Sequence, residues 1–267
     1  MTVFGLPEPS LRLGVFIGVL VLLLALEARW PRRPPRQGRR RWPVHFALVV
    51  LGTLLLRGMA ALSVPLVAVA AALWAQQAGF GLLNLLHWPP WLALVLTLLA
   101  FDALLWAQHL AFHRLPWCWR LHRVHHADQE IDVTTALRFH PLELAGSMLI
   151  KVAAVLLLGA PAEAVVIFEI ALNGLALFNH ANLRLPLALD RALRWIVVTP
   201  DLHRVHHSVL ASEHDRNFGN GLSLWDRLFG TYEAQPREGH LGMRIGLSAY
   251  EGEGPMRLGW NLLLPLK

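Results

Sequence analysis

Cysteine is nearly absent from this sequence, and Cys118 is the only one in 267 residues. A single cysteine excludes an internal disulfide and any zinc or iron–sulfur site built on cysteine ligands. A bound metal would therefore have to be held by nitrogen and oxygen atoms. Cys118 itself is expected to be a small buried or interfacial apolar residue.

Charged residues are also scarce, at 16% of the chain, whereas 55% of the residues are hydrophobic. Soluble globular proteins are far more polar. We therefore predict an all-α, multi-pass membrane protein with about four to six transmembrane helices. The stretches that are long enough, or nearly so, to cross the hydrocarbon core are Leu11 to Leu26, His45 to Ala75, Trp91 to Phe112, Leu144 to Gly159 and Ala162 to Leu177.

The second stretch is too long for one straight span, because about 1.5 Å per residue takes it well over about 40 Å. It is either one strongly tilted helix or a hairpin bent near residues 63–65, and the sequence leaves both open. More broadly, composition divides the chain into an anchor helix with a basic loop (1–43), a membrane domain (44–235) and a C-terminal tail (236–267).

Positive charge is concentrated directly after the first apolar stretch, where seven arginines lie between Arg29 and Arg41. The positive-inside rule places this loop in the cytoplasm and the amino terminus outside. Prolines interrupt the run, and Trp30 and Trp42 flank it as residues of a membrane interface do, so no nucleic-acid partner is expected. The first stretch lacks the features of a cleaved signal peptide and is expected to be a retained anchor. A bacterial inner membrane is the expected location.

One internal repeat is present: the sequence LHRVHH occurs at residues 121–126 and again at residues 202–207. Positions i, i+3 and i+4 of a helix project to one face, so each copy is predicted to offer three imidazoles to a common point. The fourth and fifth apolar stretches form a hairpin between the copies. Both copies therefore lie on the same side of the membrane, whichever way the second stretch crosses, and they can meet.

Further histidines join these two copies. His109 and His113 are an i, i+4 pair at the end of the third apolar stretch, which makes eight imidazoles on one membrane face. A zinc enzyme uses about three protein ligands and a structural zinc site about four, so eight nitrogens indicate two metals. Eight buried imidazoles without a metal would be costly at a membrane boundary.

Other histidines are less clear from spacing alone. His180, near the end of the fifth stretch, is positioned to add a ninth ligand. His140, before Pro141, is either a tenth ligand or a residue that fixes a turn. The histidines that lack partners at ligand spacing, and are not expected to bind metal, are His45, His87, His214 and His240.

The order of these elements resembles the fatty acid hydroxylase superfamily, in its sterol desaturase-like branch. HxxxH, HxxHH, an Asn-His-x-Asn element and a second HxxHH are followed by NFG at 217–219 and WDRLFGTY at 225–232, so that the resemblance covers roughly residues 95–235. It implies a helical membrane domain with a cytosolic histidine-rich helical cap and a di-iron centre. The positions that match the family's ligands are His109 and His113, then His122, His125 and His126, then His180, and finally His203, His206 and His207. Some members have a further histidine where this chain has Ala176.

The resemblance and the ligand set together predict a membrane-bound di-iron oxygenase that hydroxylates or desaturates a sterol, a fatty acyl chain or a related lipid. Two iron ions are expected, with zinc as a substitute in purified protein. The lipid would enter from the bilayer and react with O2. Electrons would come from a separate donor protein, because the chain has no segment large enough for a redox domain. The alternative is a zinc-dependent membrane lipid hydrolase or a metal carrier.

Several other residues are candidates for supporting roles. Asp128, Asp201 and Asp226 are expected either to orient ring N–H groups of the histidines or to cap helices and pair with arginines. Trp225, Leu228 and Phe229 are expected to pack the cap on the membrane domain in preference to contacting substrate. The basic residues expected to attract an electron carrier or anionic lipid headgroups are Arg114, Arg120, Arg123 and Arg204.

Overall fold

The computed structural model describes residues 2–3, 6–62, 67–86 and 88–267. Nearly all of its regular structure is helical, and the exception is a two-stranded antiparallel pair, β1 (Thr2–Val3) and β2 (Leu6–Pro7). The predicted all-α class is therefore confirmed. Cys118 is buried, as expected.

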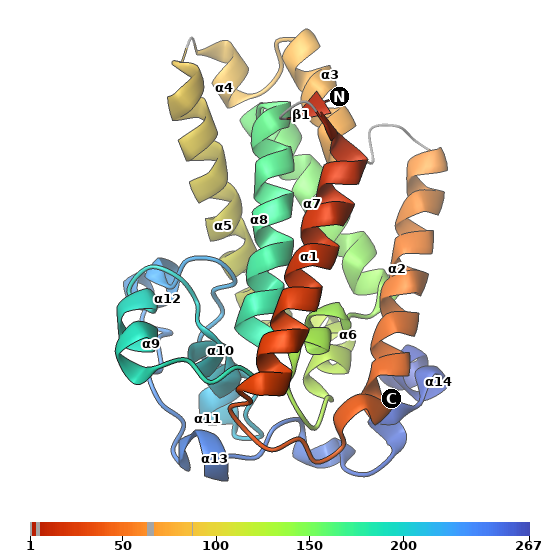
Figure 1. The fold of residues 1–267 in the computed structure, drawn as a ribbon. Coiled ribbons are helices and arrows are strands. Elements are labelled where there is room, and N and C mark those ends of the chain that lie inside the picture. The colour runs from red at the N-terminus through yellow and green to blue at the C-terminus, as the bar shows by residue number, and fades with distance from the viewer. Residues whose placement is uncertain (1, 4–5, 63–66, 87) are drawn as a thin grey trace.

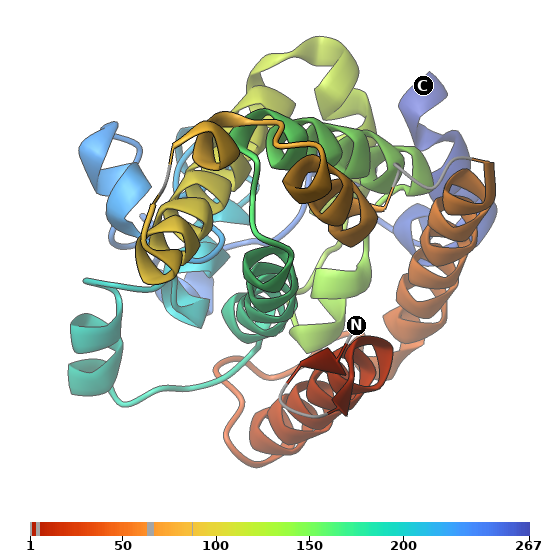
Figure 2. The same cartoon turned by 90° about the horizontal axis from the view of Figure 1, so that it is seen from above.

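In the described part of the chain, five helices are long and apolar enough to cross a membrane, and they run side by side as a bundle (Figure 1). They agree with the five predicted stretches. Seen along the bundle, α8 lies between α1 and α5 (Figure 2). These helices are α1 (Glu8–Arg29), α2 (Trp42–Leu62) with the preceding 3-10 turn η1 (Gly38–Arg41), α5 (Pro90–Arg114), α7 (Pro141–Leu158) and α8 (Ala162–His180).

The long second stretch contains one span and a separate short helix. α2 ends at Leu62, and α3 (Ala68–Gln77) has ten residues, which reach about 15 Å and cannot cross a bilayer. The interpretation as one tilted helix is therefore wrong, and the bend suggested near residues 63–65 lies outside the described residues. α3 and α4 (Leu82–Leu85) lie at the opposite end of the bundle from the C-terminal segments (Figure 1).

Local sequence sets where α7 begins and ends. His140 caps its first turn by accepting a hydrogen bond from Leu142 N on Nδ1 at 3.2 Å, and Pro141 occupies the first helical position, where no backbone donor is needed. Gly159 ends the helix with a φ of 68°, a left-handed conformation that favours glycine. The hairpin of α7 and α8 returns the chain to the end of the bundle at which α7 began.

The remaining elements gather at that end and form the cap (Figure 1). The C-terminal segment packs on it, where Leu264 joins Val44, Leu48, Val124 and Ala127 in one apolar cluster. The elements of the cap are α6 (Pro116–His126), η3 (Val133–Leu137), α9 (Leu187–Leu193), α10 (Pro200–His206), α11 (Ala211–His214), α12 (Leu224–Leu228), α13 (Gly239–Gly242), η4 (Ser248–Tyr250), η5 (Gly254–Met256), α14 (Leu258–Leu263) and η6 (Leu264–Leu266).

Candidate metal centre

Nine histidines from four helices come together where the bundle meets the cap. They form two groups, and within each group one nitrogen or oxygen ligand atom per residue lies within 4.8 Å of all the others. All nine residues singled out by sequence belong to these groups. The first group is His109, His113, His122, His126 and His206, and the second group is His125, His180, His203 and His207.

The two LHRVHH copies divide their histidines between the groups. The first copy gives His122 and His126 to the first group and His125 to the second, whereas the second copy gives His203 and His207 to the second group and His206 to the first. The expectation that the three imidazoles of one copy share a point is therefore wrong.

Helical geometry explains this division. At about 100° per residue, positions i and i+4 lie about 40° apart, whereas position i+3 lies about 60° away on the other side of i. Each copy thus presents a pair of imidazoles in one direction and a single imidazole in another. The pair of the first copy and the single imidazole of the second copy join the first group, and the reverse holds for the second group. Each copy therefore contributes histidines to both groups.

The Nε2 atoms of these rings point at one another. His109 and His122 approach at 3.1 Å between Nε2 atoms, and so do His113 and His126. In the second group, the Nε2 atom of His180 lies 3.1 Å from those of His125 and His203. Neutral ring nitrogens that face one another present lone pairs to a common point, and this is the arrangement that a shared cation requires.

The opposite ring nitrogen of most of these histidines has an oxygen partner. Among the described contacts, the Nδ1 atoms of His109, His180 and His206 lie 2.7–2.8 Å from the backbone oxygens of Phe218, Ala176 and Arg216. His125 has a longer contact to Arg138 O at 3.2 Å. These carbonyls accept from Nδ1–H, so each ring is held as the tautomer whose Nε2 lone pair faces the centre.

Two carboxylates serve the same purpose, and sequence reasoning missed both. Glu143 lies 2.7 Å from His122 Nδ1, with both side chains 3% exposed, and Asp215 lies 3.2 Å from His113 Nδ1. Glu143 stands in the first turn of α7, three residues after His140. The sequence signal that could have identified Glu143 is its position as an acidic residue at the start of an apolar span.

The surroundings of these histidines favour the neutral form of the imidazole. Burial lowers the pKa of His122 to about 3 and holds the pKa values of His203 and His206 well below the ordinary histidine value, with repulsion from neighbouring imidazoles adding to the effect in the second copy. His206 Nε2 is also fully buried and has no hydrogen-bond partner in the described part of the chain. Buried, neutral and unpaired nitrogens of this kind fit a divalent transition metal.

The other predicted histidines lie outside both groups. His140 caps α7, and its Nε2 atom lies 3.3 Å from Leu262 O, so it fixes a turn. His45 contacts Asp128 at 3.2 Å, and His240 lies 3.5 Å from Asp201. His214 stacks on Trp119 beside the first group, with Nδ1 3.2 Å from Ser208 O. His87 lies outside the described residues.

The three aspartates do not contact any of the nine histidines among the described contacts, and of the two roles left open by the sequence, pairing with arginines is confirmed for Asp128 and Asp201. Asp128 pairs with Arg41, and Asp201 pairs with Arg204. Asp226 accepts backbone N–H donors from Phe218 and Gly219, both at 2.8 Å. It thereby fixes the segment whose Phe218 carbonyl holds His109.

The basic residues near the centre have different surroundings. Arg204 is fully buried, so its expected place on a basic surface is wrong. Arg123 donates to Tyr250 Oη at 2.8 Å and to Leu264 O at 2.6 Å, and thus holds the C-terminal segment. Arg114 and Arg120 are exposed at the corner between α5 and α6.

The expected packing role of the WDRLFGTY segment is confirmed for two of its aromatic residues. Trp225 donates Nε1–H to Asp102 on α5 at 2.8 Å, and Phe229 stacks on Trp106 with ring centroids 4.5 Å apart. Leu228 is instead 64% exposed.

An apolar groove of about 180 Å³ lies between α5 and α8. Its wall on α5 is formed by Leu98, Asp102 and Leu105, and the same helical stripe continues to His109. On α8 the wall is formed by Phe168, Leu172 and Leu175, and that stripe continues to Asn179, beside His180. The groove therefore runs along the membrane helices toward the histidines of both groups.

Asn220 also lines this groove. Its side-chain Nδ2 atom is buried and has no hydrogen-bond partner among the described residues, and the same is true of Asn179 Oδ1. Asn179 Nδ2 donates to Asn220 O at 2.9 Å, which fixes the loop in place. The otherwise apolar lining thus includes a residue whose amide nitrogen is unpaired.

These features describe an integral membrane protein with two adjacent histidine groups, each of which could hold a metal ion. Comparison with known families agrees, because the family model described as fatty acid hydroxylase matches residues 94–231, a range that contains all nine histidines. The match covers just over half of the chain. The chain belongs to the fatty acid hydroxylase family, as its motifs indicated.

Curated relatives are lipid-modifying enzymes. The chain is 30% identical over 154 residues to the ornithine lipid hydroxylase OlsE of Rhizobium tropici, covering 57% of this chain and 45% of that protein. It is 26% identical over 148 residues to human alkylglycerol monooxygenase, covering 54% and 31% of the two chains. It is 27% identical over 161 residues to the fatty acid hydroxylase vlmA of a Lecanicillium species, covering 55% and 44%. The matches thus span less than half the length of these relatives, and no solved structure matches the chain.

Proposed function

We propose that the protein is a membrane-bound di-iron oxygenase that oxidises a lipid with O2 and with electrons from a separate donor protein. The observation that carries this proposal is the convergence of nine buried imidazoles into two adjacent groups. The first group would hold one iron ion and the second group the other. Bound iron supplies the O2-dependent oxidation of an unactivated C–H bond, which side chains alone cannot perform.

The chain's own residues would orient the ligands and keep water away. Ring N–H donors to Phe218 O, Ala176 O and Glu143 fix three of the rings. Phe218 is fully buried, and its ring lies 5.6 Å from that of His109 and 5.1 Å from that of His113. Phe139 stacks on His125 at 4.4 Å. These aromatic rings cover the centre and exclude water from it.

The substrate is proposed to be a bilayer lipid whose hydrocarbon chain lies in the groove between α5 and α8. The groove is apolar and lies within membrane-spanning helices, so a chain could enter it without leaving the bilayer. Its lining is not wholly apolar, because Asn220 presents an unpaired amide donor there. We expect that donor to bind an oxygen atom of the lipid and to set which carbon faces the metals.

Insertion of one oxygen atom is the favoured reaction. The relatives OlsE, alkylglycerol monooxygenase and vlmA are all named as hydroxylases or monooxygenases. Their named substrates, which are an ornithine lipid, alkylglycerols and fatty acids, share a long hydrocarbon chain next to polar atoms. Such a lipid suits an apolar groove with an unpaired amide donor in its lining.

The centre is proposed to face the cytoplasm of a bacterial cell. The arginine-rich loop between α1 and α2 contacts the cap, since Arg41 pairs with Asp128 and Arg32 N donates to Asn182 O at 2.8 Å. The positive-inside rule places that loop, and with it the histidines, on the cytoplasmic side. Cysteine accessibility in intact cells would test this, and labelling of positions 39 and 114 from opposite sides would contradict it.

The electron donor is proposed to be an acidic carrier protein that docks at the corner between α5 and α6. Arg114 and Arg120 are exposed there, and Trp117 between them is 68% exposed. A basic surface with an exposed aromatic residue suits an acidic protein partner. Arg114→Glu combined with Arg120→Glu should slow turnover with a protein donor and leave turnover with a small chemical reductant unchanged. Equal rates with the protein donor before and after charge reversal would contradict this docking site.

Metal analysis and lipid mass spectrometry test the proposed activity together. Anaerobically purified protein should contain two iron ions per chain, with zinc replacing iron after aerobic purification. Lipid extracts from cells that express the protein should contain a lipid heavier by one oxygen atom. A zinc-dependent hydrolase would instead release a lipid fragment without O2, and a carrier would change no lipid.

A further inference from the structure

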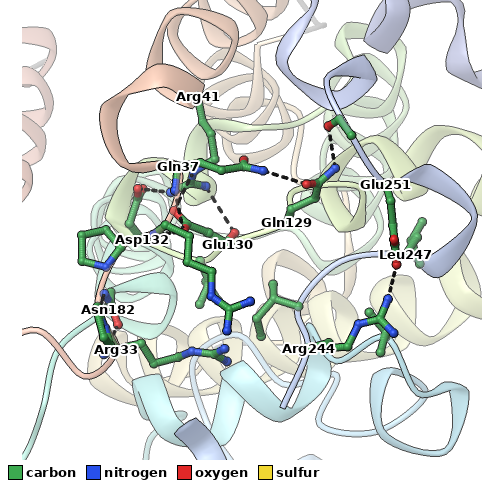
Figure 3. Close-up of a pocket in the computed structure, with 17 residues that line it drawn as sticks. Arg33, Gln37, Arg41, Gln129, Glu130, Asp132, Asn182, Arg244, Leu247 and Glu251 are labelled. Atoms are coloured by element: carbon green, nitrogen blue, oxygen red, sulfur yellow. Dashed lines mark hydrogen bonds and ion pairs between the residues drawn. The ribbon is translucent and has the colours of Figure 1, made fainter. Parts of the chain in front are cut away.

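A second cavity, of about 480 Å³, lies between the loop that joins α1 to α2 and the C-terminal part of the cap (Figure 3). One wall is the loop between α1 and α2, from Arg33 to Gln37, together with Arg41. The opposite wall is formed by Arg244, Leu247 and other residues of the segment after α13. Residues 129–132 and Asn182 complete the lining. This cavity is strongly polar, and no part of the proposed oxidation uses it.

The acidic residues of this cavity are already occupied. Glu130 accepts backbone N–H donors from Arg36, Gln37 at 2.8 Å and Gly38 at 3.1 Å. Asp132 pairs with Arg41, which also pairs with Asp128. These carboxylates thus hold the loop between α1 and α2 in its conformation and neutralise the charge of Arg41. Glu251, the remaining acidic residue of the lining, pairs with Arg244, so Arg33 and Arg36 are left without a dedicated counterion.

Arg33 and Arg36 are the arginines that lack one. Arg33 donates through Nη2 to Met243 O at 2.7 Å, whereas its buried Nη1 atom has no partner in the described part of the chain. The Arg36 side chain makes no ion pair or hydrogen bond with any described residue. Burial, followed by repulsion from Arg36, lowers the pKa of Arg33. Two neighbouring guanidinium groups repel one another, and an anion bound between them would relieve that repulsion.

The walls of the cavity are held in place by the segments that carry the histidines. Asn182, two residues after His180, accepts from Arg33 N at 3.0 Å on Oδ1 and donates to Arg33 O at 2.9 Å from Nδ2. On the opposite wall, Val209 N donates to Arg244 O at 3.0 Å, and Gly246 N donates to His207 O at 3.0 Å. The arginines are therefore mounted on fixed backbone, which lowers the entropic cost of binding a ligand.

We propose that this cavity binds an oxyanion, either a phosphate or a carboxylate, between Arg33 and Arg36. Arg244 lies on the facing wall, where its pairing with Glu251 joins two side chains that are 58% and 63% exposed. Such an exposed ion pair is weak and would yield readily to a ligand. Guanidinium groups recognise phosphate and carboxylate through paired N–H donors, and this geometry distinguishes arginine from lysine. The anion could be free in the cytoplasm or part of a lipid headgroup, and both sources share this chemistry.

The first experiment measures binding of inorganic phosphate to the intact protein in phosphatidylcholine nanodiscs, by the rise in thermal unfolding temperature. Arg33→Gln and, separately, Arg36→Gln should weaken phosphate binding by about tenfold or more. Arg40→Gln is the matched control, because Arg40 lies exposed in the same loop and outside the cavity lining. The Arg36 side chain has no described hydrogen bond, so its replacement is not expected to disturb folding.

The second experiment identifies the source of the anion. If the natural ligand is a lipid headgroup, native mass spectrometry should find phosphatidylglycerol retained by the wild type and by Arg40→Gln but lost from Arg33→Gln, and phosphatidylglycerol nanodiscs should suppress the phosphate effect. If it is a free anion, phosphate should bind equally in both kinds of nanodisc. Anion binding that is the same in Arg33→Gln, Arg36→Gln and Arg40→Gln, or absent from all three and the wild type, would overturn the proposal. Binding is measured without turnover, so either outcome leaves the proposed oxygenase activity untouched.

Discussion

His122 on α6 donates its Nδ1–H to Glu143 on α7, with Nδ1 2.7 Å from the carboxyl oxygen, and both side chains are almost fully buried. This pair ties the start of a membrane span to the first LHRVHH copy. A carboxylate in this position fixes the ring and raises the basicity of Nε2. The span therefore does more than anchor the protein, since its first turn sets the orientation of a histidine that is proposed to bind metal.

Replacing Glu143 should weaken the centre without removing any ligand. Glu143→Gln retains the shape but replaces the carboxyl group that holds the His122 ring, so we expect metal affinity or turnover to fall by about 10–100-fold. Iron titration of metal-free protein would measure it. The matched control is Glu163→Gln, at an exposed position in the first turn of α8. Equal iron affinity in the two variants would show that Glu143 does not position His122.

The division of each LHRVHH copy predicts how the two metals depend on each other. His125→Ala removes a ligand from the second group and His206→Ala removes one from the first. Because α6 and α10 contribute to both groups, either change should lower the content of both metals and abolish activity while leaving the protein inserted in the membrane. Iron content per chain is the measurement. His240→Ala should retain both metals, and a loss as severe as in His206→Ala would contradict the ligand assignment.

Protonation should destabilise the metal-free protein in mild acid. Burial holds the pKa values of His203, His206 and His207 well below the ordinary histidine value of 6.5. Below about pH 6.5 the unfolded chain therefore binds more protons than the folded chain, and the free energy of unfolding falls as the pH is lowered through that value. Thermal unfolding from pH 8 to pH 5 should show this loss, with the metal-loaded protein keeping its stability to lower pH. A flat profile for the metal-free protein would mean that these imidazoles are not buried in it.

Blocking the groove between α5 and α8 should impair use of a lipid substrate more than metal binding. Ala171 lines the groove on α8 and is exposed, so Ala171→Trp should fill it without disturbing the core. We expect kcat/KM for the lipid to fall by about tenfold or more at unchanged iron content. Ala153→Trp adds the same bulk at an exposed position of α7, outside the groove. Equal activity of the two variants would place the substrate elsewhere.

Sequence alone predicted the membrane helices and eight of the nine histidines from periodic signals, whereas His180 was identified from its place at the end of the fifth stretch and from the family resemblance. Apolar length marks a span, and i, i+3, i+4 spacing marks one face of a helix. Hydropathy alone did not separate α2 from α3, since the chain remains apolar on both sides of the break, and the sequence left one tilted helix and a bend near residues 63–65 both open. The short α3 buries Ala68, Ala71, Ala72 and Ala75. In sequence, this spacing does not distinguish a short packed helix from part of a membrane-spanning one.

The partners of the histidines could not be predicted, because they depend on contacts between distant segments. His109 is held by a carbonyl 109 residues later in the chain, and His113 by Asp215, 102 residues later. Backbone carbonyls carry no sequence signal. Arg204 was wrongly predicted to lie on the surface because it is charged. In the structure it is buried and pairs with Asp201 in the same helix, and the sequence does not distinguish such a residue from an exposed arginine.

The central claim is that the two histidine groups hold iron that oxidises a lipid with O2. Its most direct test is to supply isotopically labelled O2 and a reductant to iron-loaded protein in nanodiscs and to analyse the lipid by mass spectrometry. The account predicts a lipid product that carries one labelled oxygen atom, formed only when O2 and reductant are both present. Product formation in strictly anaerobic membranes without reductant, or a product labelled only from water, would contradict it and support a hydrolase.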